Sequence, residues 1–443
     1  MTPGTIDRAA MRVVLLSSLG GALEFFDFIV FGTFAADISR TFFPSKDPLI
    51  SLLGALAAFG AGYAARPIGG IVFGARGDTS GRRHSFLLSL SVMSAATVAM
   101  ACVPGYATWG AAGTALFVAL RLVQGFCLGG ELPGAITYAV EVVPPNRATL
   151  ACGIVFGCVS SGVLLATGIS LAIGALLPPD LIAEWGWRIA FVIGGALGIV
   201  SWGLRRSMEE SPAFLRMRAR LDTARAARAP LRELFAHHGR SMVVGFFATC
   251  VVAAFNGLLF AQTAGYLIGA LKYPRADVIG GLNIASAATA VSLVVACWFG
   301  DTIPRRYVFR LGCLIIAAGA IPAYQAMVDH AMPLSLLFLL IGLSACATHG
   351  TFASILADLF PTEVRFSGVA LTMNLSAVVF SGLGPLAATW FILTTGNPAA
   401  PGFLIVFAAV LSFAFSFALK RVGGWLDTPE SSPMLAAIPL GPR

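Results

Sequence analysis

Long runs of apolar residues, each separated from the next by a short polar segment, dominate the sequence. A helix that spans a membrane needs about 20 mainly apolar residues, and runs of that length divide the chain into twelve. The predicted spanning helices are 13–37, 49–75, 85–103, 111–139, 149–177, 188–204, 241–271, 278–299, 307–328, 334–358, 366–394 and 402–420. The pattern therefore predicts an all-α integral membrane protein with six helices, a polar break and six more.

Two short charged sequences recur at equivalent places in the two sets of helices. GDTSGRR at 77–83 and GDTIPRR at 300–306 each follow the second helix of a set. EVVPPNR at 141–147 and DLFPTEVR at 358–365 each follow a fourth helix. Internal repeats of this kind indicate a chain built from two similar halves. We therefore expect two six-helix bundles, 1–204 and 241–420, joined by a linker at 205–240 and followed by a tail at 421–443.

The composition supports a lipid environment. Charged residues make up 11% of the chain and hydrophobic residues 57%, whereas a soluble domain carries about 25% charged residues. The eight cysteines lie in apolar runs without a CxxC pair, which predicts small buried side chains and no metal site or disulfide. The sequence holds no HExxH, GxSxG or phosphate-cradling motif, so we expect neither enzyme activity nor a cofactor.

The placement of lysine and arginine predicts the orientation of the chain. These residues concentrate at the termini, after the even-numbered helices and in the linker 205–240. Because cytoplasmic segments collect lysine and arginine, both termini are expected in the cytoplasm. The net charge of +8 then reflects topology, and no nucleic-acid partner is expected. In the linker, Ser211 and Pro212 predict a helix start. Its basic surface either contacts anionic lipid or is simply solvated.

Four ionisable residues lie deep in the predicted spans, where a charge is costly unless it is paired or hydrated and therefore suggests function. Glu24 and Asp27 share one face of the first helix, about 17–21 Å into it. Two carboxylates this close favour protonation of one of them, although a pair that only fixes helix packing is the alternative. Arg121 lies at a similar level, about 15 Å into the fourth helix, and can bind a substrate carboxylate or an acid of the protein. Arg66, nearer the cytoplasm, is expected either to contact substrate or to hold a gate closed.

Other polar residues form two further groups of candidates. Within the spans, contact with a ligand and plain packing explain the pattern equally well for Tyr63, Gln124, Asn256, His349 and Asn374; His349 could also carry a proton. At the charged turns, an aspartate at a helix end and arginines across a tight turn can pair and hold one conformation closed. This gating group comprises Asp78, Arg82, Arg83, Asp301, Arg305, Arg306 and Arg365, with Glu131 expected to pair with loop arginines.

Several motifs resemble those of one family. GARGDTSGRR (74–83) resembles the signature loop of the major facilitator superfamily, and RLVQGFCLGGE (121–131) resembles its fourth-helix motif. Motifs that resemble its metabolite:proton symporter family are LEFFDFIVFG (23–32), RPIGGIVFG (66–74), EWGWRIAF (184–191), EESPAF (209–214) and DLFPTEVRFSGVALTMNL (358–375). GGALEFFDFIVFG and FGAGYAARPIGG look most like the carriers of citrate, tricarballylate and 2-oxoglutarate. The chain departs from many relatives at Phe25, where they have tryptophan, and at Ile303-Pro304, where they have a glycine-arginine-arginine turn.

The resemblance implies the major facilitator fold in the inner membrane of a bacterium. The function that it implies is proton-coupled symport of a small organic anion, a di- or tricarboxylate, by alternating access. Asp27 or Glu24 would take the proton, and Arg121 with Arg66 would bind carboxylate. The alternatives are a proton-coupled carrier of zwitterions such as betaine or proline, an exporter and, third, a membrane sensor that uses the basic linker. We expect a monomer whose partners are the anion, the proton and membrane lipid.

Overall fold

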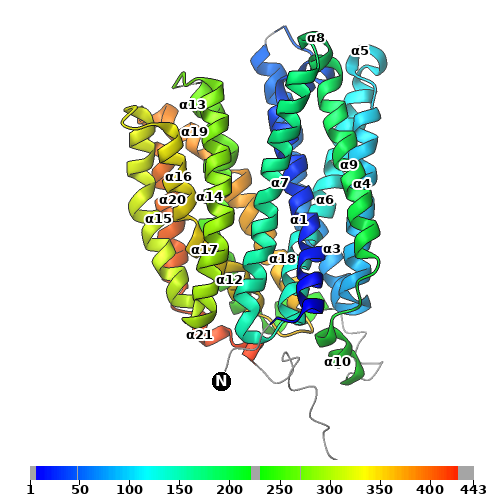
Figure 1. Cartoon of the computed structure of the whole chain (residues 1–443), viewed down its shortest axis with the longest axis vertical. Coiled ribbons are helices and arrows are strands. Elements are labelled where there is room, and N and C mark those ends of the chain that lie inside the picture. The colour runs from blue at the N-terminus through cyan, green and yellow to red at the C-terminus, as the bar shows by residue number, and fades with distance from the viewer. Residues whose placement is uncertain (1–5, 47, 221–229, 270, 428–443) are drawn as a thin grey trace, which may run out of the picture.

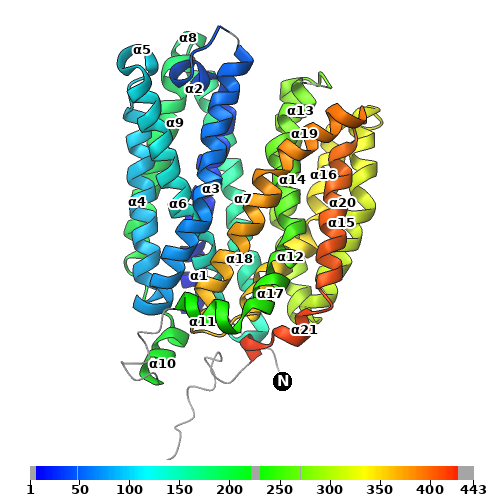
Figure 2. The ribbon, with the colours of Figure 1, turned by 180° about the vertical axis from the view of Figure 1, so that it is seen from behind.

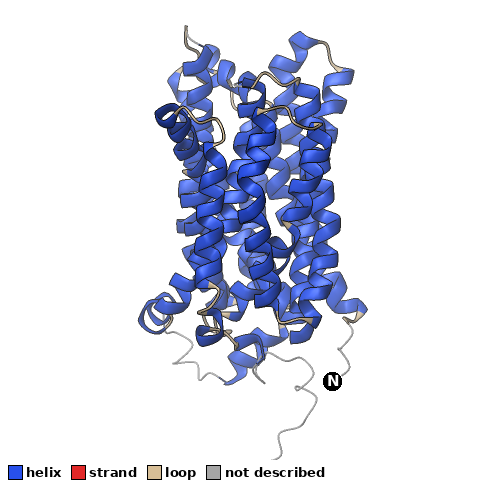
Figure 3. Cartoon of the chain, turned by 90° about the vertical axis from the view of Figure 1, so that its left-hand side faces the viewer, coloured by secondary structure: helices blue, strands red, loops and turns tan. Residues whose placement is uncertain are grey.

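The computed structural model describes residues 6–46, 48–220, 230–269 and 271–427. In this part of the chain all regular structure is helical (Figure 3). Ten of its helices are long and apolar enough to span a membrane. The remaining two predicted spans coincide with α3 (Pro48–Ser80) and with the 16-residue apolar helix α20 (Ala400–Phe415). The prediction of an all-α membrane fold is confirmed.

The first half of the chain forms one bundle around its long helices. The long helices contain 19 to 33 residues each. Short helices connect them at their ends. The elements are α1 (Arg8–Thr33), α2 (Ala35–Phe42), α3, α4 (Arg82–Cys102), α5 (Tyr106–Trp109), α6 (Ala111–Val142), η1 (Pro145–Arg147), α7 (Ala148–Leu176), α8 (Pro179–Leu181), η2 (Ile182–Gly186) and α9 (Trp187–Arg205).

Two short helices, α10 (Pro212–Arg220) and α11 (Pro230–His237), lie in the segment expected as the linker. Ser211 caps α10, because its hydroxyl accepts a hydrogen bond of 3.0 Å from the backbone N–H of Phe214. α10 therefore begins at Pro212 with Ser211 as its cap, as the sequence predicted.

The second half forms the other bundle, and two of its spans contain a π-helical segment. α12 (Gly239–Phe255) passes through a π-helical segment, η3 (Asn256–Gln262), into α13 (Thr263–Gly269). α18 (Arg365–Ser376) passes in the same way through η4 (Ala377–Gly382) into α19 (Gly384–Thr395). The other elements are α14 (Arg275–Thr302), α15 (Arg305–Val328), α16 (Leu334–Ser344), α17 (Cys346–Asp358), α20, α21 (Leu419–Val422) and η5 (Trp425–Asp427). Such π-helical turns often mark functional positions in helices.

The two bundles stand side by side and meet at one end (Figures 1 and 2). The chain begins at this end, which also carries α10, α11 and α21, and we call it the joined end. At the opposite end the ribbons of the two bundles diverge. The most extensive contacts between the bundles run between α7 and α14 and between α3 and α18. The structure therefore has one closed end and one end at which the bundles are apart.

Glycines let α3 and α6 approach backbone to backbone. A Cβ atom on Gly69 would lie 1.7 Å from the carbonyl oxygen of Phe126, and one on Gly125 would lie 2.0 Å from that of Gly62. No side chain fits at these distances, so glycine is required for the contact. The close approach brings Arg66 of α3 and Arg121 of α6 onto adjoining helices.

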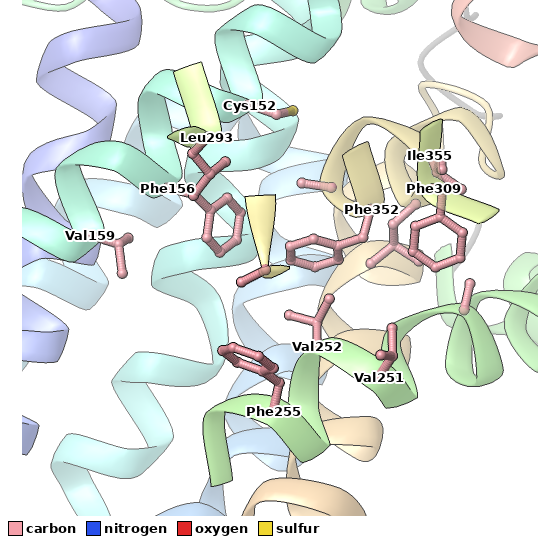
Figure 4. Close-up of a cluster of buried hydrophobic side chains, with 14 of the residues drawn as sticks. Cys152, Phe156, Val159, Val251, Val252, Phe255, Leu293, Phe309, Phe352 and Ile355 are labelled. Carbon is pink, nitrogen blue, oxygen red and sulfur yellow. The ribbon is translucent and has the colours of Figure 1, made fainter. Parts of the chain in front are cut away.

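An apolar cluster crosses the interface between the bundles (Figure 4). Phe156 of α7 meets Phe352 of α17 edge to face, with ring centroids 4.9 Å apart. Leu293 of α14 and Val252 of α12 belong to the same cluster. Outward-facing side chains are apolar as well, as Leu176 shows with 81% of its surface exposed. Lipid is the solvent that suits this exterior, so the interior contacts depend on packing rather than on exclusion of water.

Candidate functional site

Asp27, Arg121 and Gln124 form a buried polar cluster between α1, α4 and α6. Arg121 Nη1 donates to Asp27 Oδ2 at 2.7 Å and to Gln124 Oε1 at 2.6 Å. Gln124 Nε2 donates to Asp27 Oδ1 at 3.1 Å and to Thr97 Oγ1 at 2.7 Å. Asp27 is 3% exposed and Arg121 4%. The cluster thus holds one carboxylate and one guanidinium out of water, paired with each other and hydrogen-bonded to Gln124.

Aromatic rings border this cluster and support both candidate arginines. The guanidinium carbon of Arg121 lies 4.6 Å from the ring centre of Phe31 and 5.2 Å from that of Phe59. The guanidinium carbon of Arg66 lies 4.3 Å from the ring centre of Tyr63. Both contacts are within the range of cation–π attraction. The rings therefore fix the planes of two cations on neighbouring helices.

Tyr63 connects the two arginine sites through Phe59 and Phe28. Its ring centre is 5.8 Å from that of Phe59 and 5.7 Å from that of Phe28, and Phe28 and Phe59 are 4.5 Å apart. Glu24, the second predicted proton carrier, lies in α1 three residues before Asp27, and its side chain falls outside the described structure. The structure thus brings Asp27, Arg121, Gln124, Arg66 and Tyr63 into one region of the first bundle.

His349 and Asn256 meet each other in the second bundle. The His349 Nε2 atom is 3.4 Å from Asn256 Oδ1, and its Nδ1 atom is 3.2 Å from the carbonyl oxygen of Ala345. Asn256 opens the π-helical segment η3, and Ala345 is the residue at which α16 gives way to α17. The two predicted contacts therefore pair at two interrupted helices.

Asn374 joins the bundles at the level of the α3–α6 contact. Its Nδ2 atom donates to the carbonyl oxygen of Gly129 in α6 at 2.8 Å and to that of Ala370 in its own helix at 2.8 Å. The residue is 1% exposed. The structure thus places Asn374, expected as a substrate contact, in a bond between the bundles.

Arg82 is the centre of the contacts at the joined end. Its Nη1 atom donates to Asp78 Oδ1 at 2.7 Å, and its Nη2 atom donates to Glu141 Oε1 at 3.1 Å. Nη2 also donates to the carbonyl oxygen of Thr362 in the second half at 2.6 Å. Arg365, again from the second half, donates to Glu141 Oε1 at 3.2 Å. These fully buried charges tie the bundles together.

Each of the two charged repeats supplies an aspartate that caps a helix of the other half. Asp78 accepts from the backbone N–H groups of Phe366 (3.2 Å) and Ser367 (2.9 Å) at the start of α18. Asp301 accepts from those of Thr149 (3.1 Å) and Leu150 (3.3 Å) at the start of α7. Burial raises the pKa of both carboxyls to about 6, while these hydrogen bonds oppose the rise. A carboxylate at a helix N-terminus is favourable, so these hydrogen bonds offset part of the cost of burying the two carboxyls at the joined end.

The arginines of the two repeats are placed differently. Arg305 Nη2 lies 3.8 Å from Asp358 Oδ2, and both side chains are 18% exposed, whereas Arg82 is 1% exposed. Arg306 lies over the ring of Tyr307, and the exposed Arg83 donates to the carbonyl oxygen of Arg206. Of the predicted gating residues, Asp78, Arg82, Asp301 and Arg365 therefore lie in contacts that join the two halves.

Glu131 lies elsewhere, inside the first bundle. It pairs with Arg205 of α9 and accepts from Ser89 Oγ at 2.9 Å. Arg205 also donates to the carbonyl oxygens of Leu16 (2.7 Å) and Ser17 (2.6 Å) in α1. Its partner is thus the first residue of the expected linker, which the structure places in the last turn of α9. This pair ties four helices of one bundle and does not bridge the two bundles.

Three further residues, Glu141, Glu210 and Thr97, contribute to these contacts and were not predicted from the sequence. Glu141 joins Arg82 and Arg365, and its only signal was its place at the head of the repeated EVVPPNR segment. Glu210 of the linker accepts from the backbone N–H groups of Arg82 (3.0 Å) and Arg83 (3.2 Å). Thr97 completes the cluster around Asp27, and a threonine in an apolar helix gives no signal of that role. Among the described residues no group of three or more potential metal ligands lies together.

Comparison with known proteins places the chain among transporters. Residues 17–378 match the model of the Major Facilitator Superfamily. A citrate-proton symporter of Klebsiella pneumoniae is 33% identical over 429 residues, which cover 94% of this chain and 93% of that protein. A proline/betaine transporter of Salmonella typhimurium is 30% identical over 430 residues, covering 94% and 84%. The solved structure of the proton:xylose symporter XylE bound to 6-bromo-6-deoxy-D-glucose matches with a TM-score of 0.77 at 17% identity, covering 94% and 96%, and so shares the fold.

Proposed function

Because the chain belongs to the major facilitator superfamily of membrane transporters, we propose that it carries a small di- or tricarboxylate together with protons across the bacterial inner membrane. Its membership confirms the family that the motifs predicted and the expectation of a transporter rather than an enzyme. The observation that carries the proposal is the buried ion pair between Asp27 and Arg121, with Gln124 bonded to both.

The Asp27–Arg121 pair supports coupling between proton and substrate. A buried guanidinium needs a counter-charge, and Asp27 supplies it across 2.7 Å. When Asp27 takes a proton it no longer balances Arg121, and a carboxylate of the substrate can take its place against the guanidinium. Binding of the anion and protonation of Asp27 then favour each other, which is the linkage that symport requires.

The second guanidinium supports a substrate with more than one carboxylate. Arg66 is held over Tyr63, and Arg121 is held over Phe31 and Phe59 on the adjoining helix. Arginine presents two parallel donors in a fixed plane, which matches a carboxylate. Two such planes suit a di- or tricarboxylate, and similarity to a citrate-proton symporter supports this class.

A zwitterion such as betaine is the second candidate. Phe28, Phe59 and Tyr63 form a group of rings, and a quaternary ammonium binds well to such rings. Similarity to a proline/betaine transporter favours this class as well. Against it, Arg66 and Arg121 already lie over Tyr63 and Phe59, so the protein's own cations occupy ring faces that an ammonium would need.

The joined end is proposed as a cytoplasmic gate in its closed state. The excess of lysine and arginine at this end favours a cytoplasmic location. Release of the contacts around Arg82, Asp78 and Asp301 would let the bundles rock about the site and open it to the cytoplasm. A single chain supplies both bundles, and we propose that it works as a monomer.

Transport by the purified protein in liposomes tests the proposal. An inward proton gradient is imposed, and uptake of labelled citrate, succinate, 2-oxoglutarate, betaine and proline is followed. We expect uphill uptake of at least one carboxylate, abolished by Asp27→Asn, which should keep exchange of internal for external substrate. Uphill accumulation by Asp27→Asn would remove Asp27 as the proton site, and accumulation of betaine or proline without any carboxylate would establish the second candidate.

A further inference from the structure

A small cavity adjoins Asp27 between α1, α4 and α9. Its volume is about 10 Å³, which is close to the space that one water molecule requires. Asp27 of α1 and the hydroxyl-bearing Ser94 and Thr97 of α4 contribute polar atoms to its lining. Gly194 and Gly198 of α9 form the facing wall. A cavity with several polar groups is one that water enters, whereas an apolar cavity of this kind stays dry.

The glycines of α9 keep this space open. A Cβ atom on Gly198 would lie 2.1 Å from Ser94 Oγ, and one on Gly194 would lie 2.8 Å from the ring of Phe26. Any larger residue at position 198 would have to displace the Ser94 side chain into the cavity. The helix therefore carries glycine where the cavity needs room.

The polar groups around the cavity have unused capacity to accept hydrogen bonds. The Ser94 hydroxyl donates to the carbonyl oxygen of Leu90 at 2.8 Å, and the Thr97 hydroxyl donates to that of Met93 at 3.0 Å. Each oxygen of Asp27 accepts a hydrogen bond, Oδ2 from Arg121 and Oδ1 from Gln124, and a carboxylate oxygen can accept two. A water molecule can therefore donate to Asp27 and to Ser94 at once.

The polar interior of the first bundle continues from the cavity toward the joined end. Glu131 contacts Ser89 of α4 and Arg205 of α9, and a Cβ on Gly20 of α1 would collide with its carboxylate. These contacts lie on the three helices that line the cavity, at positions nearer the joined end. Glu131 is thus an ionisable group in line with Asp27 and the cavity, within a single bundle.

We propose that the cavity binds one water molecule that relays the proton of Asp27 into the first bundle, away from the face that binds substrate. Asp27 donates its O–H proton to the water oxygen, and the water passes one of its own protons to the carboxylate of Glu131. The water is thereby restored, Asp27 is left ionised and Glu131 is left protonated. Among the described side chains, the charged group that contacts Asp27 is Arg121 of α6, at 2.7 Å, and Glu24 precedes Asp27 by three residues in the sequence of α1. The relay rests on the proposed role of Asp27 as the proton site and adds its route.

Two substitutions from opposite walls test the relay, each with a matched control. Ser94→Val and Gly198→Ala fill the cavity. Ser91→Val alters another serine of α4 whose hydroxyl bonds its own backbone at 2.7 Å, and Gly203→Ala alters a glycine of α9 whose Cβ would meet nothing within 4 Å. Each variant is reconstituted, and two rates are measured with the panel compound that the unmodified protein accumulates: gradient-driven uptake and exchange at equal pH.

We expect Ser94→Val and Gly198→Ala to slow gradient-driven uptake by roughly tenfold to a hundredfold. A side chain positioned for proton transfer typically contributes about a hundredfold or more to a rate, and loss of one bound water should cost no more than that. Exchange does not require Asp27 to lose its proton, so it should stay near the rate of the controls. The relay is overturned if uptake in both variants equals that of Ser91→Val and Gly203→Ala, or if exchange falls in the same proportion as uptake. Normal gradient-driven uptake by the Asp27→Asn variant would instead overturn the proposed proton site. Failure of the relay and failure of the proton site can therefore be told apart.

Discussion

Replacing Arg82 with alanine is expected to open the joined end. Arg82 donates to Asp78, to Glu141 and to the carbonyl oxygens of Gly77 and Thr362, and it is 1% exposed. Alanine would leave the buried carboxylates of Asp78 and Glu141 with fewer hydrogen-bond donors. Those carboxylates can regain water only when the bundles separate, so the substitution penalises the closed state and leaves the open state largely unaffected.

The magnitude follows from the loss of one partner in a buried ion pair. Such a loss costs about 3–5 kcal/mol. Arg365 still contacts Glu141, and the backbone N–H groups of Phe366 and Ser367 still bind Asp78, so the low end applies. About 3 kcal/mol corresponds to roughly two powers of ten in an equilibrium constant. A gate closed about 99% of the time would then be open for about half of it.

Distances between two spin labels measure this shift. Thr79→Cys in the first repeat and Ile303→Cys in the second place labels on exposed positions at the joined end, in a background without the eight native cysteines. Arg82→Ala should add a longer distance, whereas Arg83→Ala should not, since the side chain of Arg83 is exposed and donates to the carbonyl oxygen of Arg206 at the end of α9. Turnover should fall with Arg82→Ala while substrate affinity stays near normal.

An unchanged distance in Arg82→Ala would refute the reasoning, because the ion-pair network would then contribute nothing to closure. Loss of substrate affinity with a normal distance would also refute it, since Arg82 would then act at the binding site and outside the gate.

Three further predictions concern the arginines and the two aspartate caps. Arg121→Lys should weaken carboxylate binding nearly as much as Arg121→Ala, by roughly tenfold to a hundredfold, because a charge-assisted hydrogen bond is lost. Calorimetric titration with citrate measures this change. Near-normal affinity of the lysine variant would contradict a two-donor contact. Burial raises the pKa of Asp78 and Asp301 to about 6 in the closed gate, from 3.8 when exposed. The closed gate therefore binds protons more readily, and lowering the pH from about 7.5 to about 5 should favour the short label distance, an effect that Asp78→Asn with Asp301→Asn should remove. Arg305→Ala should lengthen the label distance less than Arg82→Ala, because its ion pair is longer and part-exposed; an equal effect would show that both repeats hold the gate equally.

The sequence predicted the helices and the depth of the key charges because both follow from simple counting. Apolar runs of about 20 residues mark spans, and a rise of 1.5 Å per residue sets Asp27 and Arg121 at one level. Their ion pair in the structure agrees with that placement. Depth is therefore readable from the chain alone.

The direction in which a polar side chain points within a bundle is not readable in this way. For Gln124 and Asn374 the sequence left ligand contact and packing equally open. In the structure Gln124 binds Asp27 and Thr97, and Asn374 binds the carbonyl oxygen of Gly129. A backbone carbonyl is present at every residue, so the sequence carries no mark of such a partner. For Glu131 the sequence indicated an arginine partner but could not show that α9 turns Arg205 inward.

The two repeats share their aspartate caps but differ in their arginines, and one position explains the difference. Gly81 precedes Arg82 with φ of 110° and ψ of 147°, a conformation that favours glycine. Pro304 holds the same place before Arg305, with φ of −52°, and a proline ring cannot reach the positive value. The chain thus enters α4 and α15 by different turns.

The turn at Gly81 also makes room for the linker. A Cβ atom at this position would lie 2.3 Å from the carboxylate of Glu210, which binds the backbone of Arg82. In the second repeat the aspartate cap is kept because Asp301 lies before the altered turn, in the last turn of α14. Arg305 follows that turn, so its placement differs from that of Arg82. Closure at the joined end therefore depends more on the first repeat than on the second, although the duplication gave both the same sequence elements.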